Sequence, residues 1–306
     1  MSLTAKKLLT ATVATLAMSS CFTGIESTPR ITDDDVRDAG VTLTAEQRLG
    51  VAMTSQPPRL WAAGKQWIVR DNRIAIIFNP PAADTLLNDT LTMVALNRVP
   101  TIMGDTAVEL ILSARGRVFN YPTGVSVRDF ASRRALEIPF AVEMSPVVQA
   151  DSLLAGNTYY IKTPLWTDIA GAQHNGLRHI PVTVTRVEAG TVTRPLRVWF
   201  EQVGDSTDYS VLLTYGEGIT STRNFDCVFS FTNPRNEYPS ITDATWNNII
   251  HSQVAVGMSR DECRLALGAP TRLQRGLTTA AQVEHWSYDD GTYLIFEDGV
   301  LTRYRK

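Results

Sequence analysis

A succession of short β-rich runs most constrains what this chain of 306 residues can fold into. Between Trp61 and Phe231, runs such as LTMVALNRV (91–99) and IPVTVTRV (180–187) are separated by clusters of Gly, Pro, Asn and Asp. Breaks at strand-length intervals are typical of an all-β sandwich or barrel. We therefore expect a large β region, either undivided or split into two subdomains near residues 130–140.

Three runs in this region predict particular strands. KQWIVRDNRIAIIF (65–78) predicts two strands on either side of Asp71-Asn72, and LEIPFAVEMSPVV (136–148) predicts another. In NFDCVFSF (224–231), strand alternation places Cys227 on the same face as three phenylalanines. We therefore expect Cys227 to be a small buried hydrophobic residue.

The pattern changes to a helical one after residue 232. NPRNEYPS (233–240) has the composition of a linker, and Thr242 is placed to cap the helix that follows it. Ser259 and Glu262 form the S-x-x-E capping box of a second helix. Gly268 is placed to end that helix in a left-handed conformation.

Two hairpin signals, Asp290-Gly291 and Asp298-Gly299, lie among the β-rich runs that follow. The expected order is helix, helix, strand, strand, strand. This order resembles the SmpA/OmlA-like fold of the small lipoprotein subunit of the outer-membrane β-barrel assembly machinery. The motifs that carry the resemblance are GMS (257–259), LGAP (267–270), WSY (286–288) and FEDG (296–299). Related ααβββ units occur in other bacterial envelope lipoproteins and in β-lactamase inhibitory proteins. The resemblance covers residues 241–306 and implies a binding unit without catalytic residues.

Cys263 lies in the first turn of the second expected helix and has three interpretations. A thiolate would be stabilised at this position, which would make it a reactive thiol. In an oxidising compartment it could instead pair with Cys227 in a disulfide. Packing of Cys263 against the sheet is the interpretation that we favour. For Trp286 we favour a position in the core, and a platform for a ligand is the alternative.

The N-terminus, MSLTAKKLLTATVATLAMSSC, has the order of a secretory signal peptide. Lys6 and Lys7 form a basic region, an apolar stretch runs over 8–18, and small residues precede Cys21. The end of this segment resembles the lipobox of bacterial lipoproteins, although Met18 replaces the usual Leu. The resemblance implies cleavage before Cys21 and acylation of that cysteine. An ordinary cleaved signal peptide is the alternative.

Residues 22–31 are rich in Gly, Pro, Ser and Thr and are expected to form a tether. Thr32 should cap a short helix with Asp33–Asp35 in its first turn, and TAEQ (44–47) forms a second capping box. These aspartates lie far from Cys21 for a surface-export signal. We therefore favour the periplasmic face of the outer membrane over the cell surface.

Charge and motif content exclude several classes of function. A formal net charge of −2 without Lys/Arg runs provides no footprint for nucleic acid. No nucleotide-binding, zinc-protease or serine-hydrolase motif occurs. His174 and His179 share no helical face, and Asp33–Asp35 lack the alternating spacing of a calcium loop. We therefore predict no catalytic, cofactor-binding or metal-binding residue and no cofactor. A carboxylate pair assembled by the fold is not detectable in this way.

The fold class that we predict is mainly β with an α+β part. A large β-sandwich or barrel-like region should be followed by a small ααβββ domain. The predicted divisions are a lipoprotein signal peptide (1–20), lipidated Cys21 with tether and short helices (21–60), a β-rich domain (61–238) and an SmpA/OmlA-like domain (241–306). We expect no membrane-spanning helix after the signal peptide.

The function expected from these features is that of a lipid-anchored cell-envelope protein acting as a non-catalytic protein-binding or assembly module in outer-membrane biogenesis. Its partners would be the membrane, through acylated Cys21, and an envelope protein. The alternative is a carbohydrate-handling surface lipoprotein, which a row of exposed Trp and Tyr residues would favour. An enzyme inhibitor is a third, weaker interpretation, and the identity of a glycan or small-molecule ligand is not predicted.

Overall fold

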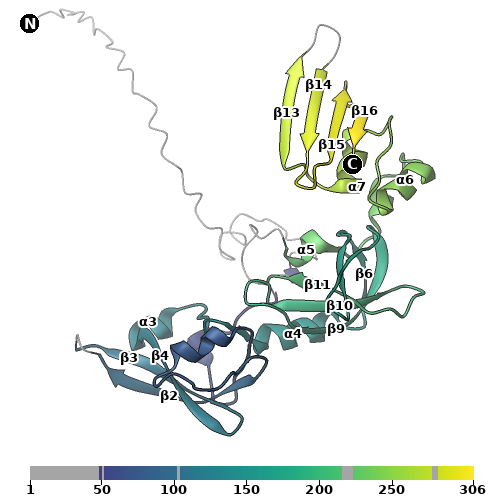
Figure 1. Ribbon diagram of the computed structural model, residues 1–306. Helices are drawn as coiled ribbons and strands as arrows, with labels where there is room; N and C mark the ends of the chain where they lie inside the picture. The colour runs from purple at the N-terminus through teal and green to yellow at the C-terminus, as the bar shows by residue number, and fades with distance from the viewer. Residues whose placement is uncertain (1–47, 50–51, 102–103, 216–222, 278–281) are drawn as a thin grey trace, which may run out of the picture. The chain divides into compact units, whose positions relative to one another are not determined.

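The computed structural model describes residues 48–49, 52–101, 104–215, 223–277 and 282–306 (Figure 1). These residues form three antiparallel sheets of five, seven and four strands with a few helices. The predicted fold class, mainly β with a small helix-and-sheet unit at the C-terminus, is confirmed. The signal peptide, acylated Cys21, the helix after Thr32 and the capping box at 44–47 lie outside the described residues. No helix in the described part of the chain is long and apolar enough to cross a membrane.

The five-stranded sheet has the order β4-β3-β2-β1-β5. Its strands are β1 (Gln66–Val69), β2 (Thr90–Pro100), β3 (Thr106–Ala114), β4 (Arg117–Ser126) and β5 (Ala141–Glu143). Arg115 and Gly116 turn β3 into β4 with φ values of 49° and 72°, as a type I′ hairpin requires. Alternate residues of β3, among them Leu110 and Leu112, are fully buried. Helix α3 (Val127–Ser132) packs Phe130 at 5.6 Å from Trp61, which follows the 3-10 helix η1 (Pro58–Leu60).

Two of the predicted strands are wrong. The second half of 65–78 forms the 3-10 helix η2 (Asn72–Ile77), because the Asp71 side chain accepts a hydrogen bond from the Arg73 backbone N–H at 2.9 Å and caps a turn. The run at 136–148 is a strand only over β5 and continues as helix α4 (Met144–Leu154). Pro146 lies in the first turn of α4, where a backbone N–H would have no partner within the helix.

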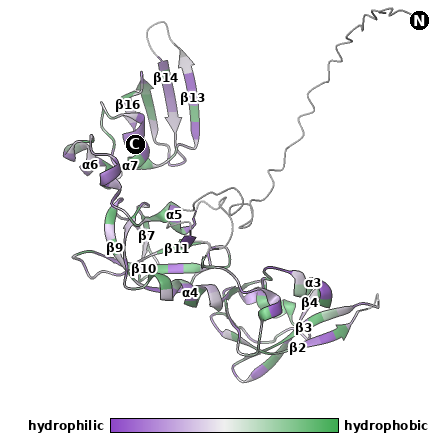
Figure 2. Ribbon diagram, turned by 180° about the vertical axis from the view of Figure 1, so that it is seen from behind, coloured by the Kyte–Doolittle hydropathy of each residue, from purple (hydrophilic) through white to green (hydrophobic). Residues whose placement is uncertain are grey.

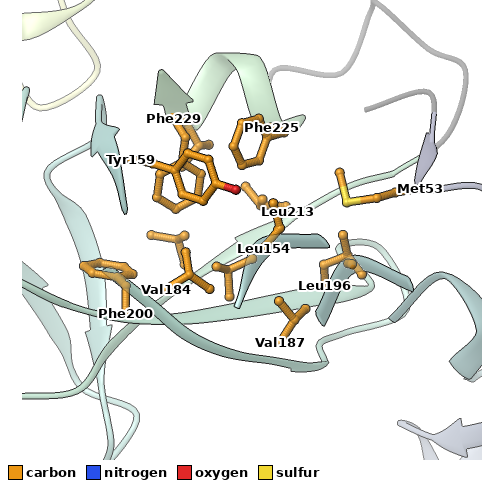
Figure 3. Close-up of a cluster of buried hydrophobic side chains, with 14 of the residues drawn as sticks. Met53, Leu154, Tyr159, Val184, Val187, Leu196, Phe200, Leu213, Phe225 and Phe229 are labelled. Carbon is orange, nitrogen blue, oxygen red and sulfur yellow. The ribbon is translucent and has the colours of Figure 1, made fainter. Parts of the chain in front are cut away.

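The seven-stranded sheet has the order β12-β6-β9-β10-β11-β7-β8. Its strands are β6 (Thr158–Ile161), β7 (Leu165–Asp168), β8 (Gln173–Asn175), β9 (Ile180–Ala189), β10 (Leu196–Gln202), β11 (Tyr209–Leu213) and β12 (Phe229–Ser230). Figure 3 shows part of its core, where the Tyr159 ring lies 5.1 Å from the ring of Phe225. Met53, which we placed in the 21–60 segment of tether and short helices, is 1% exposed and belongs to the same core.

The prediction that Cys227 is buried is wrong. Residues 224–231 are not one strand, because helix α5 (Phe225–Val228) precedes the two-residue strand β12. Helical spacing turns Phe225, Val228 and Phe229 inward, and Cys227 is exposed. Over so short a run, alternating phenylalanines are compatible with a single strand. They are equally compatible with a helical turn that is followed by a strand.

The buried side chains of the two large sheets form two clusters. The cluster of the five-stranded sheet contains buried residues from Trp61 to Ala141. The cluster of the seven-stranded sheet contains Met53 and buried residues from Val142 onward. The crossover therefore falls inside β5, next to the predicted split at 130–140. The domain boundaries themselves remain predictions.

The C-terminal unit, which follows the 3-10 helix η3 (Pro234–Glu237), contains helices α6 (Asp243–Ile250) and α7 (Arg260–Leu267) and one sheet. The sheet has four strands, β13 (Arg272–Leu277), β14 (Gln282–Ser287), β15 (Tyr293–Glu297) and β16 (Val300–Arg305), in sequential order. The expected count of three strands misses β13. Residues 272–276 of this edge strand are all exposed, so its sequence carries no pattern of a buried apolar face, and Figure 2 shows hydrophilic residues along it.

Candidate binding surface

The predicted helix caps position α6 and α7 over the sheet. The Thr242 side chain accepts a hydrogen bond from the Thr245 N–H, and Ser259 with Glu262 forms the complete capping box of α7. Gly268 follows α7 with φ at 88°, as predicted for the residue that ends the helix. These caps satisfy backbone groups that the first turns leave unpaired. The two short helices can therefore cover one face of the sheet.

The covered face holds the core of the C-terminal unit. Trp286 and Phe296 are fully buried, with ring centroids 4.6 Å apart, which agrees with the predicted core position of Trp286. Cys263 and Ala266 of α7 are also 0% exposed and belong to this core. The centre of this face is thus used for packing, whereas Leu273 on the edge strand β13 is 36% exposed.

The opposite face, which we call the outer face, is not covered by any described segment. Its side chains form three cross-strand rows. They are Arg272, Ser287, Tyr293 and Arg305; Gln274, His285, Ile295 and Arg303; and Gly276, Val283, Glu297 and Val300. All are exposed except Val283, Ile295 and Glu297, which are half-buried.

The outer face is positively charged. It carries three arginines and one carboxylate, that of Glu297. Arg303 approaches Glu297 only to 3.9 Å, and Arg272 and Arg305 form no hydrogen bond or ion pair with a described residue. Unpaired guanidinium groups beside a tyrosine and a histidine are suited to binding carboxylates, because the guanidinium fork matches two carboxylate oxygens.

Glu284 fixes the edge strand β13 to helix α7 from the covered side. Its buried carboxylate accepts hydrogen bonds from Arg260 at 2.7 Å, Arg275 at 3.1 Å and the indole N–H of Trp286 at 3.1 Å. Desolvation by burial raises the pKa of Glu284, but the hydrogen bonds from Trp286 and the two arginines outweigh it and lower the pKa below its ordinary value. Arg275 is therefore occupied, whereas Arg272 and Gln274 on the same strand remain available.

Sequence reasoning missed this role of Glu284. The available signal was its alternation with Trp286, which places both side chains on one face of β14. A glutamate on the core face of a strand requires a cationic partner. That Arg260 and Arg275 are the partners of Glu284, however, is known only from the structure.

Cys263 occupies the packed position that we favoured. Burial, together with the charge of Glu262, raises the pKa of its thiol to about 12, so a reactive thiolate is not supported. The structure does not join it to Cys227.

His174 and His179 are not brought together. His174 is exposed and stacks on Tyr209 with ring centroids 5.0 Å apart, whereas the Nε2–H of His179 donates to the Leu265 carbonyl at 3.2 Å. Among the described residues, no group of three His, Cys, Asp or Glu side chains is arranged to hold a metal ion.

An open pocket lies at one end of the seven-stranded sheet. Its charged and aromatic lining residues include Asp168, Asp208, Glu201, His174 and Tyr209. Asp168 accepts a hydrogen bond from the Ala172 N–H at 2.8 Å, and Asp208 pairs with Arg186 at 2.8 Å. Ser206 and Thr207 also line the pocket, and the Thr207 hydroxyl donates to Asp205 at 2.8 Å, so the pocket offers both hydrogen-bond donors and acceptors.

No protein-family model, curated protein or solved structure matches this chain. The likeness of residues 241–306 to the SmpA/OmlA-like fold therefore remains a prediction.

The tryptophans bear on the carbohydrate alternative. The chain has six, all within the described residues, and five of them are at most 8% exposed. Only Trp246 is half-buried, and the Arg235 guanidinium lies over its ring at 5.3 Å. Sugar-binding platforms present aromatic rings to solvent. No row of exposed tryptophans occurs in the described part of the chain, but Tyr293 and Tyr304 of the C-terminal sheet are 41% and 44% exposed. The carbohydrate alternative therefore stays a prediction.

Proposed function

We propose that this chain is a lipid-anchored protein of the bacterial cell envelope that acts as a non-catalytic protein-binding or assembly module. Acylated Cys21 would hold it on the periplasmic side of the outer membrane. The resemblance of residues 241–306 to an assembly-machinery subunit suggests outer-membrane biogenesis as the setting. The observation that carries the proposal is the outer face of the C-terminal sheet, which no described segment covers and which presents regular, positively charged rows of side chains.

The size of the outer face limits how it can bind. Four strands about 4.8 Å apart, each about six residues long at about 3.3 Å per residue, present roughly 400 Å². A stable protein interface takes about 800 Å² from each partner. The outer face alone therefore supports a weak contact, and a stable complex needs additional surface.

Acyl labelling tests the anchor. Cys21→Ala should abolish the label and release the protein into the soluble fraction, because acyl chains provide the membrane affinity. The matched control is Cys227→Ala, which removes an exposed cysteine and should leave label and location unchanged. A labelled, membrane-bound Cys21→Ala protein would refute the anchor.

Affinity purification from gently solubilised native membranes tests the binding function. We expect a stoichiometric protein partner, and recovery of the barrel-assembly machinery would identify the chain as an accessory subunit. The double variant Arg303→Glu/Arg305→Glu should reduce recovery, whereas the control Arg98→Glu, an exposed arginine on β2, should not. Recovery of no partner, together with glycan binding by the purified protein, would favour the carbohydrate alternative instead.

A further inference from the structure

The edge strands of the three sheets differ in whether they could pair with a further strand. Six strands end the sheets: β4, β5, β8, β12, β13 and β16. Strands β5, β8 and β12 have three, three and two residues, too few to template a further strand. Strand β4 contains Pro122 and Gly124 and shifts register against β3, and its Asn120 carbonyl accepts a hydrogen bond from the Asn79 N–H at 2.9 Å. These four edges are unsuited to extending a sheet.

The last strand of the C-terminal sheet is also occupied over its first residues. Val300 forms a bridge with Ser259, the Gly257 N–H donates to the Leu301 carbonyl at 2.9 Å, and the Leu301 N–H donates to the Met258 carbonyl at 2.8 Å. The segment before α7 therefore covers this part of β16.

Strand β13 is different from the other five. All six of its residues pair with β14 without a register shift, from Arg272 opposite Ser287 to Leu277 opposite Gln282. It contains no proline, and no described segment pairs with its other edge. Residues 272–276 are exposed. Such an edge presents unpaired backbone N–H and carbonyl groups to a further strand.

We propose that β13 accepts an extended segment of a partner protein as a fifth strand, and that this segment alternates acidic with apolar residues. The inference rests on the proposed protein-binding function and names the chemistry of the partner. Backbone hydrogen bonds would supply affinity, and alternate side chains would supply specificity. The added strand would also extend the outer face, by about 95 Å² for six residues, and so enlarge the contact.

The positive charge of the outer face indicates that the partner segment has acidic side chains on that face. Arg272 has no ion-pair partner among the described residues, and Gln274 lies two residues further along the same face. Arg275 points to the other face and is held by Glu284, so it does not compete for the carboxylates. Gly276 leaves open space, since a Cβ atom there would meet nothing within 4 Å. Acidic side chains of a neighbouring strand would lie beside Arg272.

The covered face indicates that the alternate side chains of the partner segment are apolar. Leu273 pairs with Trp286 on the face that the helices cover, yet it is 36% exposed. Its exposure arises because β13 lies at the edge of the sheet. An apolar side chain on the added strand would cover Leu273 and remove this surface from water.

A second copy of this chain is a poor occupant. Pairing β13 with itself would place the Arg272 side chains of both copies on the same face of one seam. Like charges in neighbouring strands are destabilising. An acidic partner has the opposite effect.

Hydrogen–deuterium exchange of the full-length, detergent-solubilised protein tests the proposal, read by mass spectrometry over residues 272–277. The probes are a short capped peptide in which Glu alternates with Val, its Lys counterpart, and the Glu peptide N-methylated at alternate amides. The Glu peptide should slow exchange about tenfold at a concentration ten times its dissociation constant. The Lys and N-methylated peptides should not, since they lack the charge and the backbone donors respectively.

Charge-reversed variants provide the controls. Arg272→Glu should weaken binding of the Glu peptide by about fivefold, whereas Arg98→Glu on β2 should leave it unchanged. Failure of the Glu peptide to slow exchange, or equal protection by the Glu and Lys peptides, would overturn the proposal. Protection that needs only a higher protein concentration would identify a second copy as the occupant. Protection by phosphatidylglycerol vesicles alone would identify an anionic lipid surface as the occupant. Either of these last two results would also overturn the proposal.

The same measurement separates this proposal from the proposed function. A partner recovered from native membranes can be added back to the purified protein. If that complex forms while residues 272–277 exchange as in the free protein, the binding function holds and strand addition fails. If no protein partner is recovered but the Glu peptide protects β13, the proposed protein-binding function in the envelope is wrong. Strand addition to β13 is then still supported.

Discussion

The ammonium of Lys65 lies 2.5 Å from Oε1 of Glu143, and both side chains are buried, at 3% and 5% exposed. Lys65 also donates to the Ser145 hydroxyl at 3.0 Å and to the Gln56 side-chain carbonyl at 3.2 Å. The ring of Trp61 lies 5.1 Å from the same ammonium. Every hydrogen of the ammonium therefore has an acceptor, and the start of β1 is fixed to β5 and α4.

We expect Lys65→Met to destabilise the fold by about 3–5 kcal/mol, because it leaves the Glu143 carboxylate buried without its partner. Urea denaturation followed by circular dichroism measures the loss. The double variant Lys65→Met/Glu143→Leu should recover much of it, since no buried charge remains. The control is Arg73→Ala, which breaks an exposed pair with Asp71 and should have no detectable effect. A single variant as stable as the original protein would contradict this account.

The parts of the fold that the sequence predicts correctly depend on near neighbours. Ser259 and Glu262 are three residues apart, and their capping box forms as expected. Asp298 and Gly299 have φ values of 49° and 87°, as their hairpin turn requires. Local backbone chemistry decides these features, and local sequence contains it.

The features that the sequence misses depend on distant partners. Lys65 and Glu143 are 78 residues apart, and Arg260 and Glu284 are 24 apart. Nothing near Lys65 indicates that it is buried. Likewise β13 has the composition of a loop, and its pairing with β14 makes it a strand. The outer face therefore became visible only when the register of four strands was known.

His179 should make the protein less stable in acid. Burial lowers its pKa to about 4, with the Leu265 carbonyl opposing the shift and the charges of Arg178 and Lys162 adding to it. Its Nδ1 atom is buried without a hydrogen-bond partner, and its ring lies 5.8 Å from that of Trp246. The folded protein therefore offers no acceptor to a second ring proton.

Between about pH 6.5 and pH 4 the unfolded chain holds a proton on His179 and the folded chain does not. Stability should therefore fall as the pH falls through this window, by about 3 kcal/mol. Urea denaturation at a series of pH values measures the slope. His179→Asn suits the positive φ of 56° and should flatten the slope within the window, whereas the exposed control His285→Asn should not. Equal slopes in the original protein and His179→Asn would assign the acid sensitivity to other groups.

Removing the charge of Glu284 should loosen the attachment of β13 to α7. Glu284→Gln keeps the size of the side chain but leaves Arg260 and Arg275 without their carboxylate. We expect a local loss of about 1–3 kcal/mol, seen as faster amide exchange in α7 and β13. Glu297→Gln changes the carboxylate of the outer face and should leave these amides unchanged. Faster exchange in both variants would show that the effect is not specific to the buried site.

The two cysteines of the described chain should react differently with iodoacetamide. In a Cys21→Ala background at pH 8, a thiol with a pKa of about 12 is only about 10⁻⁴ ionised, so buried Cys263 should stay unlabelled in the folded protein. Exposed Cys227 should be labelled, although slowly, because desolvation and the charge of Asp226 raise its pKa. Denaturation should make both reactive. Labelling of Cys263 at the rate of Cys227, or a linked peptide under non-reducing conditions, would show that the thiol is not held in the core.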